Sequence, residues 1–163
     1  MRGTQKVFGG IILVVVALGL ELVPQQASSR SPGSFTQAVN AEPVPAFHST
    51  VPAGQLPETL SPALFTDPVA QNAYSVAARI KKILYQEPCY CHCDRSQGHG
   101  SLLDCYVSKH AAVCGICVRE DFYAYEQSRK GKTAAQIREG IERGDWQGVD
   151  VTKYESAIPA PTK

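Results

Sequence analysis

Apolar residues recur at helical spacing in the middle of the chain. Thr66 or Asp67 can cap a helix that has Pro68 in its first turn. The apolar residues that follow at steps of three and four are Val69, Ala73, Val76, Ile80 and Ile83 or Leu84. Pro88 disfavours helical geometry at the residue before it. The pattern therefore predicts one amphipathic helix of about 18 residues that ends near Tyr85.

Three further helices are predicted in the second half of the chain. They cover residues 101–109, residues 114–129 and a segment that begins after Thr133. Thr133 and Gln136 have the spacing of a capping box, and Gly144 ends this last helix. Strand-like alternation nowhere exceeds a few residues. We therefore expect a mostly α fold: a small helical domain with a cysteine-rich loop between its first two helices.

The N-terminus has a different pattern, an uncharged apolar run over residues 7–20 that follows Arg2 and Lys6. The run is short for a membrane span and has the length of the apolar part of a signal peptide. Residues 1–26 are therefore predicted to be a signal peptide or, if uncleaved, an N-terminal membrane anchor. Either role places the domain outside the cytoplasm, in a periplasm or anchored on the outer side of the cytoplasmic membrane.

Proline, serine and alanine dominate the segment between this run and the first helix. Seven of the eleven prolines lie within residues 24–62, where charges are few. Such a segment buries little apolar surface, so residues 27–61 are predicted to be a disordered or extended linker in which His48 is solvated. The folded domain is expected over residues 62–152, followed by a flexible tail over residues 153–163.

Charge and motifs exclude several classes of function. Sixteen basic and fifteen acidic side chains give a net charge of +1, which provides no basis for binding nucleic acid. The chain contains no phosphate-binding glycine loop and no supported Ser-His-Asp constellation. Whether the protein is an enzyme stays open. Arg119, Glu120 and Asp121 are interpreted as a solvated helix face.

The six cysteines gather within residues 89–117, together with three of the four histidines. We take all nine side chains as candidate metal ligands: Cys89, Cys91, Cys93, Cys105, Cys114, Cys117, His92, His99 and His110. Thiolate and imidazole together suit a tetrahedral Zn(II) site, and thiolate suits Cu(I). A haem group is not expected, because Cys-x-x-Cys-His is absent.

The spacing of the cysteines favours a metal over simple bridges. Cys89, Cys91 and Cys93 point to one side of an extended segment, or a loop folds them around one centre. Disulfides between such close neighbours are strained. Cys114 and Cys117 lie at a predicted helix start, where the helix dipole favours the thiolate. The core ligand set predicted from the spacing is Cys91, Cys93, Cys114 and Cys117.

Two other hypotheses stay open. In a thiol-disulfide redox protein, Cys114 is the nucleophile and Cys117 the resolving partner. In an interaction module, three disulfides staple a small exported domain. Metal content after anaerobic purification separates the metal hypothesis from the redox hypothesis.

The cysteine-rich segments also resemble a known family. The sequence Pro-Cys-Tyr-Cys-His-Cys-Asp over residues 88–94, with residues 98–105, 114–117 and 131–141, is similar to the CYCXC family. That family is related to the exported bacterial proteins named after a PCYCGC motif. The similarity extends over about residues 56–146.

This resemblance implies the fold, export and a functional cysteine cluster, but no reaction. Some CYCXC proteins are selenoproteins with selenocysteine at the X of the motif, where this chain has His92. Histidine keeps a metal ligand and lacks the oxidisable atom. We therefore expect an exported protein that binds Cu(I) or Zn(II) through its Cys and His cluster and acts in metal handling.

Overall fold

The computed structural model describes residues 42–156, which belong to a compact unit assigned to Asn40–Lys163. Its α-helices are α1 (Pro68–Arg79), α2 (Lys81–Leu84), α3 (Cys93–Gln97), α4 (Asp104–Val107), α5 (Gly115–Arg129) and α6 (Ala134–Glu142). Its 3-10 turns are η1 (Pro62–Leu64), η2 (Ala111–Val113), η3 (Asp145–Gly148) and η4 (Val151–Tyr154). No strand occurs within 42–156, so the mostly α fold is confirmed.

The predicted signal or anchor segment, residues 1–26, lies outside the described residues. Among the helices formed by residues 42–156, none has the length and apolar character needed to cross a membrane.

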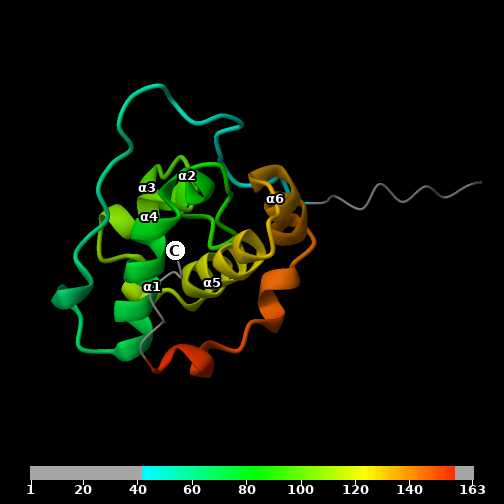
Figure 1. Ribbon diagram of the computed structural model, residues 1–163. Coiled ribbons are helices and arrows are strands. Elements are labelled where there is room, and N and C mark those ends of the chain that lie inside the picture. The colour runs from blue at the N-terminus through cyan, green and yellow to red at the C-terminus, as the bar shows by residue number, and fades with distance from the viewer. Residues whose placement is uncertain (1–41, 157–163) are drawn as a thin grey trace, which may run out of the picture. The chain divides into compact units, whose positions relative to one another are not determined.

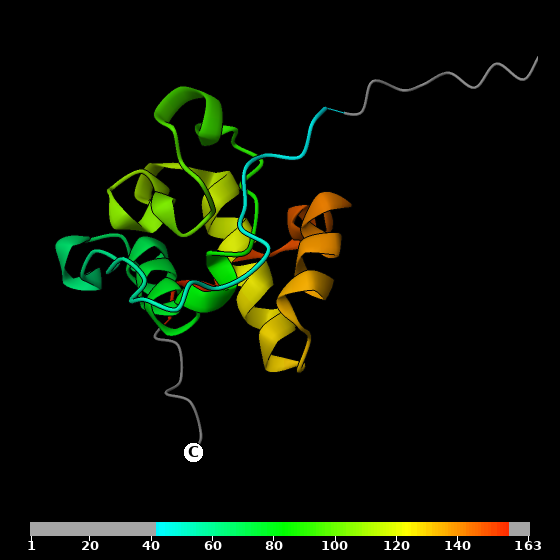
Figure 2. The ribbon, with the colours of Figure 1, turned by 90° about the horizontal axis from the view of Figure 1, so that it is seen from above.

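Helix α5 is the centre of the unit and packs against α1, α2 and α6 (Figures 1 and 2). Most of its residues are buried, on more than one side: Cys117, Val118, Glu120, Asp121, Phe122, Tyr123, Ala124 and Gln127. A helix with one solvated stripe would not bury five consecutive residues. Because much of α5 is enclosed, the side chains of Cys117, Glu120 and Asp121 near its start are held in buried positions.

Local signals explain where most helices begin and end. The Asp67 side chain accepts hydrogen bonds from the N–H groups of Val69 and Ala70, at 3.4 and 3.1 Å, and so caps α1 as predicted. Thr133 and Gln136 form the predicted capping box of α6.

The predicted single helix is two helices. Ile80, with φ −116° and ψ 26°, interrupts the helical backbone between α1 and α2. Apolar spacing is the same for one long helix and for two short helices in tandem, so the sequence pattern did not reveal the break. The second helix is turned so that Leu84 is fully buried.

Residues 42–61, here called the strap, have no regular helix or strand but pack on the helices. The strap follows one side of the unit (Figure 2, cyan). The Leu60 N–H donates to the carbonyl oxygen of Tyr106 at 2.9 Å, and the His48 ring stacks on Tyr85 with centroids 4.0 Å apart. The expectation of an unpacked linker and a solvated His48 is therefore wrong for this part of the chain.

The C-terminal boundary also lies later than expected. Tyr154 is buried, its ring stacks on Phe122 with centroids 3.6 Å apart, and its hydroxyl donates to Glu126 at 2.9 Å. The packed unit thus includes residues 153 and 154, which the sequence analysis assigned to a flexible tail. Residues 157–163 of that tail lie outside the described range.

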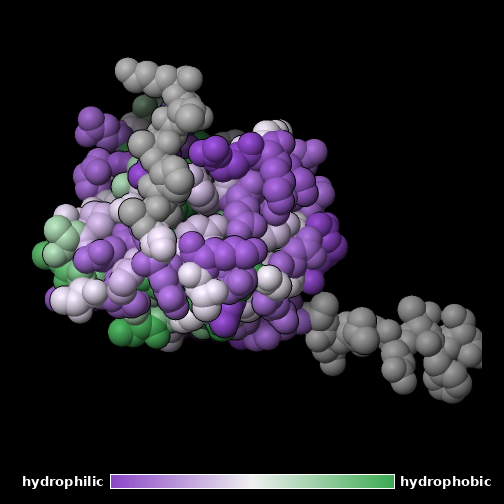
Figure 3. Space-filling view, turned by 60° about the horizontal axis from the view of Figure 1, so that its bottom comes forward, coloured by the Kyte–Doolittle hydropathy of each residue, from purple (hydrophilic) through white to green (hydrophobic). Residues whose placement is uncertain are grey.

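The surface in Figure 3 is mostly hydrophilic, with small hydrophobic areas. Across residues 42–156 the exposed large hydrophobic side chains are Val44, Leu64, Val107 and Val113. Of these, Val113 is the most exposed, at 88%.

Glu87, just after α2, is fully buried. Its carboxylate oxygens have no hydrogen-bond partner among the described residues. Burial raises the pKa of this carboxyl from 4.5 to about 9, against the lowering effect of Arg138. The carboxyls of Glu142 and Glu120 raise it further. Glu87 is therefore protonated in the folded protein at neutral pH.

This shift predicts a pH dependence of stability. Between pH 4.5 and 9 the unfolded chain ionises Glu87 while the folded chain holds its proton, so the free energy of unfolding falls as pH rises. For the reduced, metal-free protein we expect Glu87→Gln to remove roughly 2–4 kcal/mol of the fall between pH 5 and pH 8, measured by urea denaturation. Glu139→Gln, on the exposed side of α6, is the control for loss of one carboxyl. An unchanged pH slope in Glu87→Gln would contradict the burial argument.

Candidate metal centre

The motif loop, residues 89–93, folds three cysteines around one centre. The His92 N–H donates to the Cys89 carbonyl oxygen at 3.1 Å, which closes a turn, and Cys93 then begins α3. Cys89 and Cys93 are buried and Cys91 is half-buried. Of the two arrangements predicted from the alternating spacing, the loop is the one present.

Five sulfur atoms meet where this loop contacts α4 and the first turn of α5. The Cys89 sulfur lies 3.3 Å from that of Cys91 and 3.4 Å from that of Cys117. The Cys91 and Cys117 sulfurs are 3.7 Å apart, and the Cys93 and Cys105 sulfurs are 3.4 Å apart. All six cysteines fall within the described residues, and none forms a disulfide there.

These separations fit a metal centre. With metal–sulfur bonds of the usual length, two thiolates on one tetrahedral Zn(II) lie about 3.8 Å apart. There are two groups of four donor atoms, and within each group all four atoms lie within 4.8 Å of one another. One group is Cys89, Cys91, Cys93 and Cys105, and the other is Cys91, Cys105, Cys117 and His110. A cysteine and histidine cluster able to hold a metal ion is therefore present.

His110 is the histidine that joins a donor group. Its Nε2 atom lies 3.5 Å from the Cys91 sulfur, and the Gln97 side-chain nitrogen lies 2.7 Å from its Nδ1 atom. In this orientation the Gln97 side-chain amide donates a hydrogen bond to His110 Nδ1. The imidazole proton then lies on Nε2 and faces the Cys91 sulfur. A turn of the amide by 180° would let its oxygen accept from Nδ1 and free Nε2 for a metal.

The other predicted ligands lie at the margin or outside. The His99 Nδ1 atom is 3.4 Å from the Cys105 sulfur, beside the cluster but in neither donor group. Cys114 occupies the N-cap position of α5, without a capping hydrogen bond from its side chain, and also belongs to neither group. The predicted core set of Cys91, Cys93, Cys114 and Cys117 is therefore not assembled as such, and Cys89 and Cys105 lie where Cys114 was expected.

The cluster favours one thiolate in particular. Hydrogen bonds from the thiols of Cys105 and Cys114 lower the pKa of Cys91 well below its usual range. A thiolate at Cys91 is the form that binds a metal.

Two acidic side chains next to the cluster were interpreted wrongly from the sequence. Glu120 and Asp121 are fully buried rather than solvated. Glu120 accepts a hydrogen bond from the Tyr90 N–H at 2.9 Å, and burial raises its pKa to about 8. Charged residues in a row ordinarily indicate an exposed helix face, but α5 is enclosed. The signal that points to Glu120 is its spacing of three residues from Cys117.

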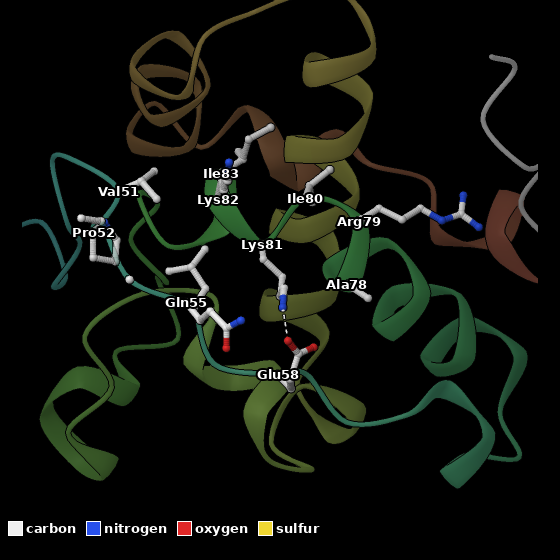
Figure 4. A pocket seen from close by; sticks show the side chains of 13 residues that line it. Val51, Pro52, Gln55, Glu58, Ala78, Arg79, Ile80, Lys81, Lys82 and Ile83 are labelled. Carbon is white, nitrogen blue, oxygen red and sulfur yellow. Dashed lines mark hydrogen bonds and ion pairs between the residues drawn. The ribbon is translucent and has the colours of Figure 1, made fainter.

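A separate groove of about 660 Å³ lies between the strap and the junction of α1 and α2. Lys81 reaches across it to Glu58, with 2.7 Å between Nζ and Oε1, whereas Arg79 extends away (Figure 4). None of its lining residues is a cysteine or a histidine. The groove is therefore distinct from the sulfur cluster.

His92 has a structural role in the motif loop. Its φ of 56° lies in the left-handed region, and no other non-glycine residue within 42–156 has a positive φ. Its Nε2 atom lies 3.5 Å from a carboxylate oxygen of Glu42, and His92 belongs to neither donor group. The side chain thus contacts the strap, while its backbone makes the turn.

We expect the backbone at His92 to decide the effect of substitutions there. Glycine adopts the left-handed region freely, whereas a β-branched residue does not. His92→Gly should be more stable to urea than His92→Val by roughly 1–2 kcal/mol, and should bind Zn(II) as tightly as the wild type. A weakened affinity in His92→Gly would show instead that the imidazole is a ligand.

Comparison with known proteins gives one match. The family described as "Protein of unknown function with PCYCGC motif" matches residues 15–153. No curated protein and no solved structure is significantly similar to the chain. The matched range includes the motif loop, which here has His92 in place of the motif's glycine, and both donor groups. Since the match covers most of its length, the chain belongs to the PCYCGC family, as its resemblance to CYCXC proteins implied.

Proposed function

We propose that this protein binds a thiophilic ion, Zn(II) or Cu(I), at the sulfur cluster and acts in metal handling outside the cytoplasm. The observation that carries the proposal is the convergence of five cysteines and His110 into two donor groups, each within 4.8 Å. Thiolate-rich sites of this kind select soft and borderline ions over Mg²⁺ or Ca²⁺. The extracytoplasmic location rests on the apolar run behind Arg2 and Lys6.

A surface thiol supports handling of the ion rather than its permanent burial. Cys114 interacts with the thiols of Cys91 and Cys117 but is only partly buried. It lines a shallow depression of about 270 Å³, together with Val113, Gly115 and other residues. Cys114 is therefore positioned to take an ion from solvent or from another molecule and pass it inward by ligand exchange.

The redox hypothesis receives less support. A nucleophilic Cys114 requires a lowered pKa. A hydrogen bond with Cys117 lowers the pKa of Cys114, but its interaction with Cys91 and its burial outweigh that effect and raise the pKa overall. The dipole at the start of α5 therefore does not give this residue the properties of an attacking thiolate.

The first test is metal binding itself. Reduced full-length protein should bind Zn(II) or Cu(I) tightly in anaerobic titrations, and binding should raise the melting temperature because the ligands meet only in the folded chain. The double variant Cys93→Ser/Cys117→Ser removes one ligand from each donor group, because Cys93 belongs only to the first and Cys117 only to the second. It should lose most of the increase in melting temperature. Cys114→Ser is the matched control and should keep it. Protein taken directly from cells with three disulfides that resist mild reductant would overturn the proposal.

The second test addresses the role of Cys114. In Cys114→Ser we expect transfer of the bound ion to a chromophoric chelator to slow by about tenfold or more, with stoichiometry and affinity unchanged. A lost surface ligand raises the barrier to exchange without altering the donor groups. Ile116→Ala, a change on the same turn that removes no ligand, is the control. Equal transfer rates for Cys114→Ser and the wild type would assign Cys114 no part in exchange.

A further inference from the structure

We infer that the sulfur cluster holds a pair of divalent thiophilic ions that share the sulfur atoms of Cys91 and Cys105. This inference rests on the proposed function, because it assumes that the cluster binds metal. It adds the number of ions, their charge and the two ligands that join them.

The two donor groups overlap in a specific way. Cys91 and Cys105 belong to both groups. Each group then has two ligands of its own, which are Cys89 and Cys93 in one group and Cys117 and His110 in the other. An ion in either group reaches four ligands only by using both shared sulfurs. Cys89 and Cys117 also meet across the two groups, with 3.4 Å between their sulfurs, whereas Cys93 and His110 each join one group only. When all six donors are used, both ions can be four-coordinate at the same time only if Cys91 and Cys105 bridge them.

The distances around the shared cysteines agree with this arrangement. The Cys91 sulfur lies 3.3 Å from that of Cys89 in one group, and 3.7 Å from Cys117 Sγ and 3.5 Å from His110 Nε2 in the other. The Cys105 sulfur lies 3.4 Å from that of Cys93. The Cys91 sulfur thus lies close to Cys89, which is found in the first group alone, and to Cys117 and His110, which are found in the second group alone. A thiolate has lone pairs for two soft ions, so a sulfur in this position can bind both.

Within a filled pair, charge favours divalent ions. With all five cysteines bound as thiolates beside a neutral imidazole, the ligands carry five negative charges. Two Zn(II) ions leave one negative charge, whereas two Cu(I) ions leave three. Four of these five cysteines are buried, and the Glu120 carboxyl packs nearby. Uncompensated charge in such a place is costly, so the pair of divalent ions gives the most stable filled state.

The test is a titration of the reduced, metal-free full chain. Native mass spectrometry with Zn(II) should show two bound ions. With Co(II) as a spectroscopic probe, thiolate-to-cobalt absorption should rise up to two equivalents. The electron paramagnetic resonance signal should grow with the first equivalent and shrink with the second, because bridging sulfurs couple the two spins. Saturation at one ion would overturn the inference and leave the proposed function intact, whereas no binding would overturn both.

Variants distinguish the shared ligands from the others. Cys93→Ser should lower the stoichiometry from two ions to one, and Cys91→Ser should abolish the spin coupling and bind at most one ion. Ile116→Ala, which removes no ligand, should keep two coupled ions. Two coupled ions in Cys91→Ser would contradict the bridging role. If far-ultraviolet circular dichroism shows that Cys91→Ser is unfolded, His110→Gln serves in its place. His110 is partly exposed. The His110→Gln variant should lose one ion, and retention of two ions would overturn the assignment.

Discussion

Contact between the motif loop and the first turn of α5 is the interaction on which the rest of this small domain depends. Cys89 on the loop and Cys117 on α5 are both part of the buried core, so the site and the core are made of the same atoms. Tyr106 strengthens the junction, because its buried hydroxyl donates to the Cys117 carbonyl oxygen at 3.1 Å. A domain of this size has limited apolar surface to bury, so an ion bound at the proposed site would add a link between the motif loop and α5.

Helix boundaries could be predicted where a short stretch of sequence decides them. The Asp67 cap and the capping box at Thr133 involve residues two or three positions apart, and both were found. The strap was missed because its contacts, such as Leu60 with Tyr106, join residues far apart in the sequence. Proline content excludes regular helix in that segment, but it does not exclude packing.

The same distinction holds for the candidate site. Clustering along the chain was enough to identify the cysteines, since the loop and the start of α5 are close in sequence. It was not enough to choose among them, and Cys114 was preferred to Cys89 and Cys105. Which thiols face inward depends on how α4 meets α5, where the Tyr106 hydroxyl donates to the Cys117 carbonyl oxygen. Glu120 was missed for a related reason, because the enclosure of a central helix cannot be seen in that helix alone.

The turn at His92 has a mechanical consequence. Glu42, the first described residue, pairs with His92 and with Arg95, the latter through a distance of 2.7 Å between Oε1 and Nη1. The strap therefore enters the unit directly beside the motif loop. A glycine at position 92 would ease the backbone but provide no side chain for this attachment. Force applied at Glu42 would therefore act directly on the ligand-bearing loop, through His92, and on α3, through Arg95.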